Sequence, residues 1–487
     1  MSPLINVSLS MSNRLAVIAG PSRRLSAGER LSSIKKILLI QPSEATPFSE
    51  YSLPTRYPRN LFNLAAALIQ RFSNLEVVVV DLGLPGVDLR DVLRDVRPNL
   101  VGITFSTPQY KETGDIVEAI RQELEEHVII VGGGVHATAL PQQTIRELDF
   151  DYIVKHEGEV VFPDLVAALD RGGKINQVKS LVFWDADNIG ETNEARRIRN
   201  LDQFPLPTEV LPVGFLDQYA NLQGVEQAGV LAPVMTSRGC SFACAFCGSN
   251  VVFLKEAGVP QVTFSTFERI MEELWSLYAD HGITKIYFED DFFDIKRTRA
   301  ARVASAIIAH QLPLEIYFRA VPKRGRPDDA AYYDLLYRAG VRMISFGVES
   351  GDPVLLKKLN KSHPLPFVGP ANKAVQSAGI KTNFYLMVGL PGQDWKSIDL
   401  TRKLLARHTP DSIGVAISMP YPGTALAKME GISIHTGFEH MMHEPPRQQK
   451  GRLYLPHTYT DVMSSRDIGF ARQYLLDYFT QLQQERA

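Results

Sequence analysis

Cysteine is scarce in this chain, and the scarcity is informative. Only three of the 487 residues are cysteines, Cys240, Cys244 and Cys247, and all three lie in the stretch "CSFACAFC". An odd, clustered set excludes a disulfide framework and favours a reducing compartment, so we predict a cytoplasmic protein. Long apolar runs are also missing. None approaches the roughly 18 residues that a membrane-spanning helix needs, which predicts no membrane span.

An excess of positive charge is absent as well. The formal net charge is -2, which argues against a nucleic-acid partner bound through bulk positive charge. The chain lacks G-x-G-x-x-G after its first strand and G-x-x-x-x-G-K-[ST] anywhere, so nicotinamide cofactors and nucleoside triphosphates are poor candidate ligands. With 45% apolar residues, the chain has enough hydrophobic material for the two or three domains that its length predicts.

The first half alternates short apolar strands with helical stretches. We expect residues 1–33 to be a poorly ordered extension. Residues 34–170 predict a Rossmann-like, doubly wound parallel sheet, because apolar runs without alternation are typical of strands covered on both faces. Proline density marks residues 171–229 as a linker with a small hairpin. The expected strands span 36–41, 75–82, 99–106, 127–133 and 151–159, and helices are expected at 58–72, 87–97, 111–126 and 141–149.

A second β/α series occupies residues 230–425. Six strand and helix pairs fit there, short of the eight in a closed barrel, which predicts a partial (β/α)6 barrel. Residues 426–487 are predicted to form a mostly helical C-terminal segment. The expected strands span 230–240, 285–293, 314–320, 342–350, 381–392 and 411–424, with helices at 266–282, 297–311, 329–340, 367–379, 395–408 and 464–484.

The three cysteines indicate a metal centre. Thiolates select zinc, copper(I) or iron–sulfur clusters. A structural zinc ion is bound by four protein ligands, usually in two separated pairs. This chain has no second pair of cysteines and no nearby histidine. A [4Fe-4S] cluster normally takes four cysteines, so three leave one iron open for substrate or cofactor chemistry. Three thiolates are therefore the right number for a reactive cluster.

The spacing C-x3-C-x2-C after the first barrel strand resembles the cluster motif of radical S-adenosylmethionine (SAM) enzymes. The resemblance implies that the open iron of a [4Fe-4S] cluster chelates the amino and carboxylate groups of SAM. It also implies reductive cleavage of SAM to a 5′-deoxyadenosyl radical, with the electron coming from a donor such as flavodoxin or ferredoxin. Phe246 matches the aromatic residue that lies beside the adenine in this family.

Further motifs resemble the same family in the same order along the barrel. "YFEDDFF" resembles the second-strand motif, and it offers Glu289 or Asp290 to the SAM amino group. "FRA" places Arg319 where a cation meets the SAM carboxylate. "FGVESGD" resembles the ribose motif, with Glu349 or Ser350 as hydrogen-bonding partners. "YLMVGLPGQ", with Gly389 and Pro391, resembles a loop that closes over the cofactor.

The first domain resembles the cobalamin-binding domain of cobalamin-dependent radical SAM enzymes. The D-x-H-x-x-G loop that supplies a histidine to cobalt in other cobalamin proteins is missing, so the resemblance implies base-off cobalamin without a histidine ligand. His136 is then expected to touch the corrin periphery or to pack locally. The resemblance rests on three segments, "RPNLVGITFSTPQY", "GGGVHAT" and "KHEGE", and its implied binding residues are Ser106, Thr107, Gly133, Gly134, His136, Glu157, Gly158 and Glu159.

Together the two domains imply cobalamin-dependent methylation of an unactivated carbon of a small-molecule substrate. Cyclisation or rearrangement, including porphyrin ring closure, stays open because relatives use the same two domains for it. An iron–sulfur or cobalamin sensor is a third possibility, which the ordered array of SAM motifs disfavours. His435, His440 and His443 look like metal ligands by composition, but scattered solvated histidines are the better interpretation.

Overall fold

The computed structural model describes residues 6–10, 15–19, 29–43, 57–124, 128–194, 197–220, 230–253, 261–361, 365–435 and 456–486. The chain divides into two compact units. Unit 1 comprises residues 1–45, 54–230 and 251–282, and unit 2 comprises residues 46–53, 231–250 and 283–487. Over the described ranges, no helix is both long enough and apolar enough to cross a bilayer.

Unit 1 is built on a nine-stranded sheet in the order β1-β2-β4-β3-β5-β6-β7-β8-β9. Its middle five strands are parallel, and the flanking strands pair antiparallel. The strands are β1 (Asn6–Ser10), β2 (Leu15–Ala19), β3 (Lys36–Gln41), β4 (Glu76–Asp81), β5 (Leu100–Thr104), β6 (Ile129–Gly133), β7 (Tyr152–Val154), β8 (Leu181–Asp185) and β9 (Asn188–Glu191), with the short β12 (Thr263–Phe264) apart from the sheet.

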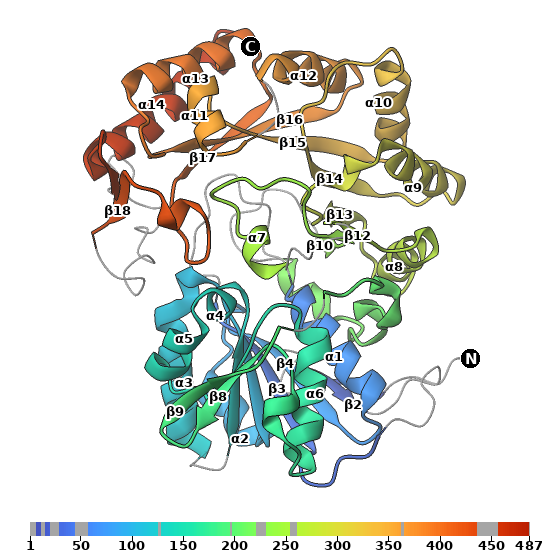
Figure 1. Cartoon of the computed structure of the whole chain (residues 1–487). Coiled ribbons are helices and arrows are strands. Elements are labelled where there is room, and N and C mark those ends of the chain that lie inside the picture. Colours follow the sequence, from blue (N-terminus) through green and yellow to red (C-terminus); the bar gives the residue numbers. More distant parts are fainter. Residues whose placement is uncertain are drawn as a thin grey trace. The chain divides into compact units, whose positions relative to one another are not determined.

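Helices cover both faces of this sheet, as the sequence predicts. In Figure 1, α1 and α6 lie on one face and α2 and α3 on the other. The parallel strands lie in the order β4-β3-β5-β6-β7. The chain adds β4 on one side of β3 and the later strands on the other side, so the switch point lies between β3 and β5. Open α/β sheets bind ligands at the carboxyl ends of strands beside such a switch point. The helices are α1 (Arg59–Arg71), α2 (Leu89–Val96), α3 (Tyr110–Leu124), α4 (Val135–Ala139), α5 (Pro141–Glu147), α6 (Gly158–Asp170) and α8 (Phe267–Ala279).

The structure extends the sheet of unit 1 beyond the bounds expected for the first domain at both ends. Residues 1–33 are not simply a disordered extension, because β1 and β2 extend the sheet beyond β4 and Leu15 is buried in its core. Residues 171–229 are not simply a linker either. The expected hairpin forms there as β8 and β9, and it continues the same sheet past β7.

The structure also groups the first helix of the barrel series with unit 1. Helix α8 carries Glu273, whose side chain forms a buried ion pair with Arg59 of α1 at 2.6 Å between Oε1 and Nη2. Arg269 of the same helix donates to the carbonyl oxygen of Phe204 at 2.6 Å. Unit 2 resumes at residue 231, next to the boundary expected at residue 230, and these contacts explain why residues 251–282 group with unit 1.

Unit 2 contains a six-stranded parallel sheet in the order β10-β13-β14-β15-β16-β17. Six parallel strands with intervening helices are the partial (β/α)6 barrel that the sequence predicts. The strands are β10 (Leu231–Val234), β13 (Lys285–Phe288), β14 (Glu315–Ala320), β15 (Val341–Glu349), β16 (Lys381–Val388) and β17 (Ser412–Ile417), with the short β11 (Ser237–Arg238), β18 (Ile432–Ile434) and β19 (Thr458–Thr460) outside this sheet.

The helices of unit 2 alternate with its strands, and a C-terminal helix follows. In Figure 1 this last helix, α14, lies beside α13. Helix α7 (Ser249–Val252) follows the cysteines and spans the division between the units. The helices of unit 2 are α9 (Arg297–Ala309), α10 (Asp329–Arg338), α11 (Pro353–Lys358), α12 (Val368–Ser377), α13 (Trp395–Arg407) and α14 (Ser465–Gln484).

Several strands are shorter than expected because the chain turns at their carboxyl ends. The strand expected at 151–159 stops at Val154, since His156 adopts a φ of 64° and α6 begins at Gly158. The strand expected at 381–392 stops at Val388, because Gly389 has a φ of 78°. Left-handed residues at these places redirect the backbone into loops at the edge where ligands bind.

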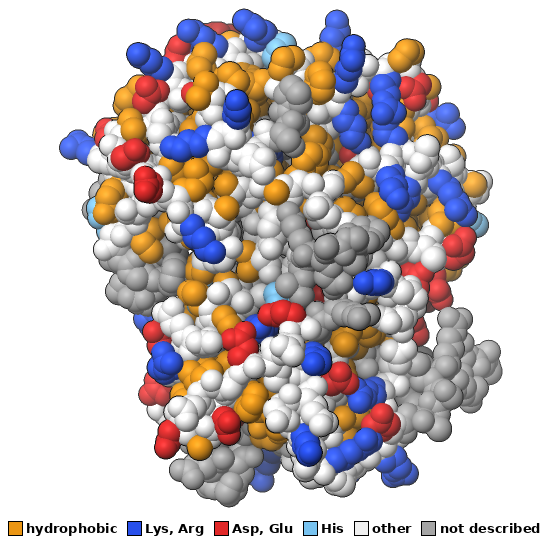
Figure 2. Space-filling model, viewed as in Figure 1, with side chains coloured by type: hydrophobic (Ala, Val, Ile, Leu, Met, Phe, Trp, Pro, Cys, Tyr) orange, Lys and Arg blue, Asp and Glu red, His pale blue; other side chains and the backbone are white. Residues whose placement is uncertain are grey.

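The surface fits the near-zero net charge. Figure 2 shows acidic and basic side chains interspersed on the face in view, rather than a field of one sign. Of the histidines in the C-terminal segment, His435 stacks on Tyr459 with ring centroids 4.4 Å apart, and its Nε2 lies 2.8 Å from the hydroxyl of Ser465. His440 and His443 lie outside the described residues.

Candidate functional site

The cysteine loop leaves the carboxyl end of β10 and is anchored at once by a buried carboxylate. Asp290, which follows β13, accepts hydrogen bonds from the Thr236 amide at 3.0 Å, the Thr236 hydroxyl at 2.7 Å and the Ser237 hydroxyl. Burial raises the pKa of Asp290, while these hydrogen bonds oppose that shift. Asp290 therefore fixes where the loop starts. Of the two acids offered to the SAM amino group, Glu289 and Asp290, it is Asp290 that has this positioning role.

The middle of the loop is tied to a second segment of unit 2. The amide of Ala245 donates to the carbonyl oxygen of Leu359 at 2.9 Å, and the side chain of Asn360 donates to the carbonyl oxygen of Ala243 at 2.9 Å. A tight turn closes the loop, with the Cys247 amide donating to the Cys244 carbonyl at 3.2 Å. Both peptides that flank Cys244 are thus held from outside the loop.

The three thiols form a donor set that suits a cluster. All three are partly buried. Burial raises the pKa of Cys240 to about 12 and also raises the pKa of Cys244, so these two bare thiols hold their protons and metal binding must displace them. Within the described ranges no three His, Cys, Asp or Glu side chains could hold one metal ion together. A [4Fe-4S] cluster asks for a different geometry, because each sulfur binds a separate iron.

A buried ion pair lies beside this loop. Lys361 Nζ donates to Glu349 Oε1 at 2.8 Å, and the two side chains are only 5% and 10% exposed. The ammonium also lies 5.4 Å from the ring centroid of Phe246, within reach of a cation–π contact. Burial lowers the pKa of Lys361, but the charge and hydrogen bond of Glu349 act in the other direction and the pKa is raised, which keeps the lysine charged.

Arg319 of β14 presents an unused donor at the same edge of the sheet. Its Nη2 donates to the carbonyl oxygens of Glu289 at 3.0 Å and Asp290 at 3.4 Å. Its Nε is buried and, among the described residues, has no hydrogen-bond partner. A buried guanidinium with a spare N–H is suited to an anion, since guanidinium and carboxylate form strong charge-assisted hydrogen bonds. The residue therefore fits the SAM carboxylate predicted for it.

The remaining barrel residues of the prediction lie at the carboxyl ends of neighbouring strands. Glu289 follows β13, and Glu349 ends β15. The buried hydroxyl of Ser350 accepts from the Asp352 amide at 3.1 Å, so it shapes the turn after β15. The Gly389 amide donates to Gln393 Oε1 at 2.7 Å, and the Pro391 carbonyl accepts from Lys358 at 3.2 Å. Ser350, Gly389 and Pro391 thus help to form turns in the structure.

Unit 1 contains a pocket of about 210 Å³ beside the switch point of its sheet. Most of its walls are aliphatic or aromatic side chains and glycine backbone. A Cβ added at Gly133 would meet only the Val154 carbonyl, at 3.6 Å, so this glycine leaves space open. Such a slot suits a flat apolar group like the aromatic base of the cobalamin tail. The lining residues are Leu39, Asn60, Leu61, Leu64, Gly102, Ile103, Thr104, Val131, Gly132, Gly133, Gly134, Val154, His156, Gly158, Glu159 and Phe162.

Four of the eight residues predicted for this domain, Gly133, Gly134, Gly158 and Glu159, line the pocket. Gly134 needs to be glycine, because its φ is 98° and a Cβ would lie 2.5 Å from the Phe105 carbonyl oxygen. Ser106, Thr107, His136 and Glu157 do not line the pocket. The Ser106 amide donates to Gln109 Oε1 at 2.9 Å, and Glu157 Oε2 accepts from the Ile198 amide at 2.8 Å.

His136 is a core residue. It is fully buried, its Nδ1 lies 3.0 Å from the Thr107 hydroxyl, and its ring packs 4.7 Å from that of Tyr110 between centroids. Burial lowers its pKa to about 4, with the charge of Glu147 acting weakly in the other direction, so the ring is neutral at physiological pH. Local packing was one of the two roles expected for it.

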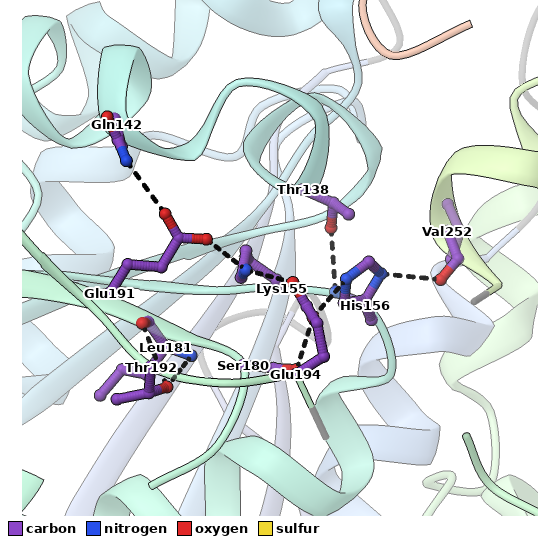
Figure 3. Close-up of polar contacts among 10 residues, drawn as sticks. All are labelled: Thr138, Gln142, Lys155, His156, Ser180, Leu181, Glu191, Thr192, Glu194 and Val252. Atoms are coloured by element: carbon purple, nitrogen blue, oxygen red, sulfur yellow. Dashed lines mark hydrogen bonds and ion pairs between the residues drawn. The ribbon is translucent and has the colours of Figure 1, made fainter. Parts of the chain in front are cut away.

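His156, which sequence inspection passed over, forms part of the pocket wall. Figure 3 shows its ring between Glu194 and Val252. Nε2 lies 2.7 Å from Glu194 Oε2, and Nδ1 lies 3.1 Å from the Val252 carbonyl oxygen. Both ring nitrogens of His156 are thus engaged by groups of the protein itself.

The neighbouring Lys155 completes this network. Its ammonium pairs with Glu191 at 2.6 Å and with Glu194, and Gln142 donates to Glu191 at 3.0 Å (Figure 3). The strand-end turn is thereby tied to the β8–β9 hairpin and the segment after it. The signal that could have found His156 is the sequence "KHEGE", where a turn is required between β7 and α6 and a histidine takes the left-handed conformation.

Lys361 is the other residue that sequence inspection missed. It follows Asn360, whose φ of 53° ends α11, and asparagine after a helix is a recognisable stop signal. The stop is readable, but the burial of the next residue against Glu349 and the cysteine loop is not. That burial depends on how β15 and the cysteine loop pack around Lys361, which the local sequence does not show.

Comparisons with known proteins agree with this geometry. Residues 234–405 match the model of the radical SAM superfamily, and residues 54–166 match the model of the B12 binding domain. The chain is 29% identical over 395 residues to an uncharacterised methyltransferase of Pyrococcus horikoshii, covering 81% of this chain and 82% of that protein. It is 26% identical over 346 residues to the anaerobic magnesium-protoporphyrin IX monomethyl ester cyclase of Cereibacter sphaeroides, covering 69% of this chain and 54% of that protein.

The fold is shared with a solved structure. The radical SAM methyltransferase TsrM of Kitasatospora setae, solved with cobalamin and a [4Fe-4S] cluster bound, superposes with a TM-score of 0.68 at 18% identity. The match covers 92% of this chain and 89% of that one. At this identity the likeness concerns the arrangement of strands and helices.

The fold and the three-thiol loop define a radical SAM enzyme that also carries a B12 binding domain. This chain belongs to the cobalamin-dependent radical SAM family. Its cofactors are a [4Fe-4S] cluster, SAM and cobalamin. It acts on a substrate and needs a reductant.

Proposed function

We propose that this enzyme is a methyltransferase that transfers a methyl group to an unactivated carbon of a small molecule. The observation that carries the proposal is the presence of two separate cofactor sites in one chain. One is the cysteine loop at the strand ends of unit 2, and the other is the apolar pocket at the switch point of unit 1. The methyltransferase named for Pyrococcus horikoshii, which matches along four fifths of the chain, supports this choice.

The residues divide the work of holding the cofactors. Cys240, Cys244 and Cys247 would bind the cluster, and Phe246 would pack beside the adenine of SAM. Arg319 would donate to the SAM carboxylate through its unpaired Nε, and Glu289 and Glu349 stand at neighbouring strand ends. Gly133, Gly134, Gly158 and Glu159 would contact the cobalamin tail. When bound, these groups supply a hydrogen-abstracting radical and a methyl donor.

The environment and the reductant are part of the proposal. Free cysteines that must reach iron as thiolates need a reducing, oxygen-poor compartment, so we place the enzyme in the cytoplasm. A small low-potential protein such as flavodoxin or ferredoxin would supply electrons, because clusters of this class have strongly negative potentials.

A cyclase is the second candidate function. It is favoured by the similarity to the magnesium-protoporphyrin IX monomethyl ester cyclase, which extends over two thirds of this chain. Both candidates use the same radical chemistry, but only the methyltransferase needs a methyl group to pass from SAM to the corrin. The two functions therefore differ in a product that can be measured before the substrate is known.

The test is anaerobic reconstitution with iron, sulfide and hydroxocobalamin, followed by reduction and addition of SAM with a trideuterated methyl group. A methyltransferase should yield 5′-deoxyadenosine. It should also yield methylcobalamin that is three mass units heavier than the unlabelled compound, because its methyl group carries three deuterium atoms. 5′-Deoxyadenosine without labelled methylcorrin would favour the cyclase. A protein that binds no iron, or that makes no 5′-deoxyadenosine, would rule out both.

A further inference from the structure

The turn after α11 grips the cysteine loop at one residue. Leu359 accepts from the amide of Ala245, and Asn360 donates to the carbonyl of Ala243, each at 2.9 Å. These two partners are the residues on either side of Cys244. The next residue of the turn, Lys361, places its ammonium over the ring of Phe246, which lies between Cys244 and Cys247 in the sequence. The turn thus brings one buried cation to the centre of the loop.

This cation is held at a conformational cost. Its partner Glu349 has a φ of 65° at the end of β15, a conformation that costs a non-glycine residue on the order of 1 kcal/mol or more. Gly347 has no room for a side chain, because a Cβ there would lie 2.7 Å from Glu349 Oε1 and 3.1 Å from Lys361 Nζ. The register of β15 and β16 also shifts between Gly347 and Glu349.

Stability does not explain such a pair. Removing two charges from water costs several kcal/mol per ion, and their attraction repays this only in part, so an apolar pair would serve the fold at least as well. The environment of Lys361 has a second feature. Its Nζ lies 5.4 Å from the ring centroid of Phe246, the residue directly before Cys247, while it pairs with Glu349 at 2.8 Å. The positive end of the pair therefore lies against the cysteine loop.

We propose that Lys361 is a positioning residue that offsets the negative charge of the cluster ligands and so makes the cluster easier to reduce. The inference rests on the proposed function, since it needs a cluster on the three cysteines. The physical reason is that the reduction potential of an iron–sulfur cluster depends on net charge and burial around it. A fixed cation in a low-dielectric site stabilises the added electron. Glu349 holds the ammonium in place, and the turn of Leu359 and Asn360 fixes its distance from the loop.

The test uses the full-length reconstituted holoenzyme and measures the midpoint potential by EPR-monitored titration, with iron and sulfide content. Lys361→Met removes the charge at similar length, and Lys361→Arg keeps it. The double variant Glu349→Gln with Lys361→Met leaves no buried charge unpaired. Lys357→Met, which removes an exposed lysine from α11, is the matched control.

We expect Lys361→Met and the double variant to have more negative midpoint potentials, and Lys361→Arg and Lys357→Met to stay close to the parent enzyme. If Lys361→Met fails to hold a cluster and Lys361→Arg holds one, the charge is again required. An unchanged potential in the double variant with full iron content would overturn the proposal. So would a loss of cluster that arginine does not restore, because that points to packing alone. A parent enzyme without iron would instead refute the proposed function.

Discussion

The cysteine loop of unit 2 and the pocket of unit 1 are built in opposite ways. The loop gathers its chemistry within eight residues and uses side chains, with other segments serving to hold it. The pocket gathers residues from β3, β5, β6, β7, α1 and α6 and consists mainly of backbone and apolar surface. A site that makes bonds to a metal depends on a few exact atoms, whereas a site that holds a large cofactor by burial depends on the shape of the whole sheet.

The largest effect should come from breaking the loop. Cys244→Ser should abolish cluster assembly, because a hydroxyl is a poor substitute for a thiolate on iron and a cluster left with two cysteines has no stable fit. Iron content should fall to about zero and no 5′-deoxyadenosine should form, while cobalamin binding should persist. Ser241→Ala, an exposed neighbour in the same loop, is the control that should keep the cluster. A serine variant that still cleaves SAM would contradict the ligand assignment.

The second prediction breaks the pocket. Gly133→Val should weaken cobalamin binding by about a hundredfold or more, roughly 2.7 kcal/mol, because the new methyl groups occupy the open slot. The cluster and SAM cleavage should remain. Binding can be followed by the corrin absorption that co-purifies with the protein.

A matched glycine lies on the other face of the same sheet. A Cβ at Gly114 of α3 would meet only the end of the Leu148 side chain, at 3.3 Å, so Gly114→Ala should leave cobalamin bound. If the Gly133→Val variant binds cobalamin as tightly as the parent enzyme, the pocket does not hold the cobalamin tail.

These two sites also differ in how much of them the sequence predicts. The cysteine spacing is local, so the three candidate ligands could be identified directly from the sequence. The six strands of the barrel and the five parallel strands of the first sheet could be predicted because buried strands are continuous apolar runs. The side-chain environment of Lys361 and the part of the pocket wall formed by His156 could not be predicted from the sequence. Each depends on contacts with residues about ten to a hundred positions away, Glu349 in one case and Val252 in the other.

The sequence left Glu289 and Asp290 open for the SAM amino group, for a physical reason of the same kind. Both residues follow β13, and the sequence does not show which of two adjacent acids turns into the core. The structure buries Asp290 completely against Thr236 and Ser237. In the same way, β1 and β2 are short, β1 pairs with β2 and β2 pairs with the distant β4, and a short run of five residues carries little periodicity.

The third prediction concerns unit 2 and separates Arg319, proposed to bind SAM, from Asp290, which anchors the cysteine loop. Arg319→Met should weaken SAM binding by about ten- to a hundredfold, roughly 1.4–2.7 kcal/mol, because a charge-assisted hydrogen bond is lost. Arg319→Lys should recover part of the affinity through charge. Equilibrium dialysis of SAM against the reconstituted enzyme measures both. Equal affinity in all three proteins would show that the unpaired Nε does not face the carboxylate.

The smallest effect on cofactor binding is predicted for His136, a buried histidine of the core. Its pKa is lowered to about 4, so the folded protein resists protonation of this ring while an unfolded chain accepts a proton below about pH 6.5. The unfolded state then binds more protons between those values, and stability rises with pH across the window. The stabilising contribution is fully present above pH 6.5 and is lost progressively as the pH falls towards 4. At pH 5 the loss amounts to about 2 kcal/mol.

His136→Leu should remove this pH dependence. The melting temperature of the parent should fall more steeply than that of the variant between pH 7 and pH 5, and the difference between the two curves isolates this residue from other titrating groups. The Thr107 hydroxyl loses its partner, so the variant should also be slightly less stable at neutral pH. Cobalamin binding should be unchanged, because the ring does not line the pocket. Weaker corrin binding with no change in the pH dependence would place His136 at the cofactor instead of in the core.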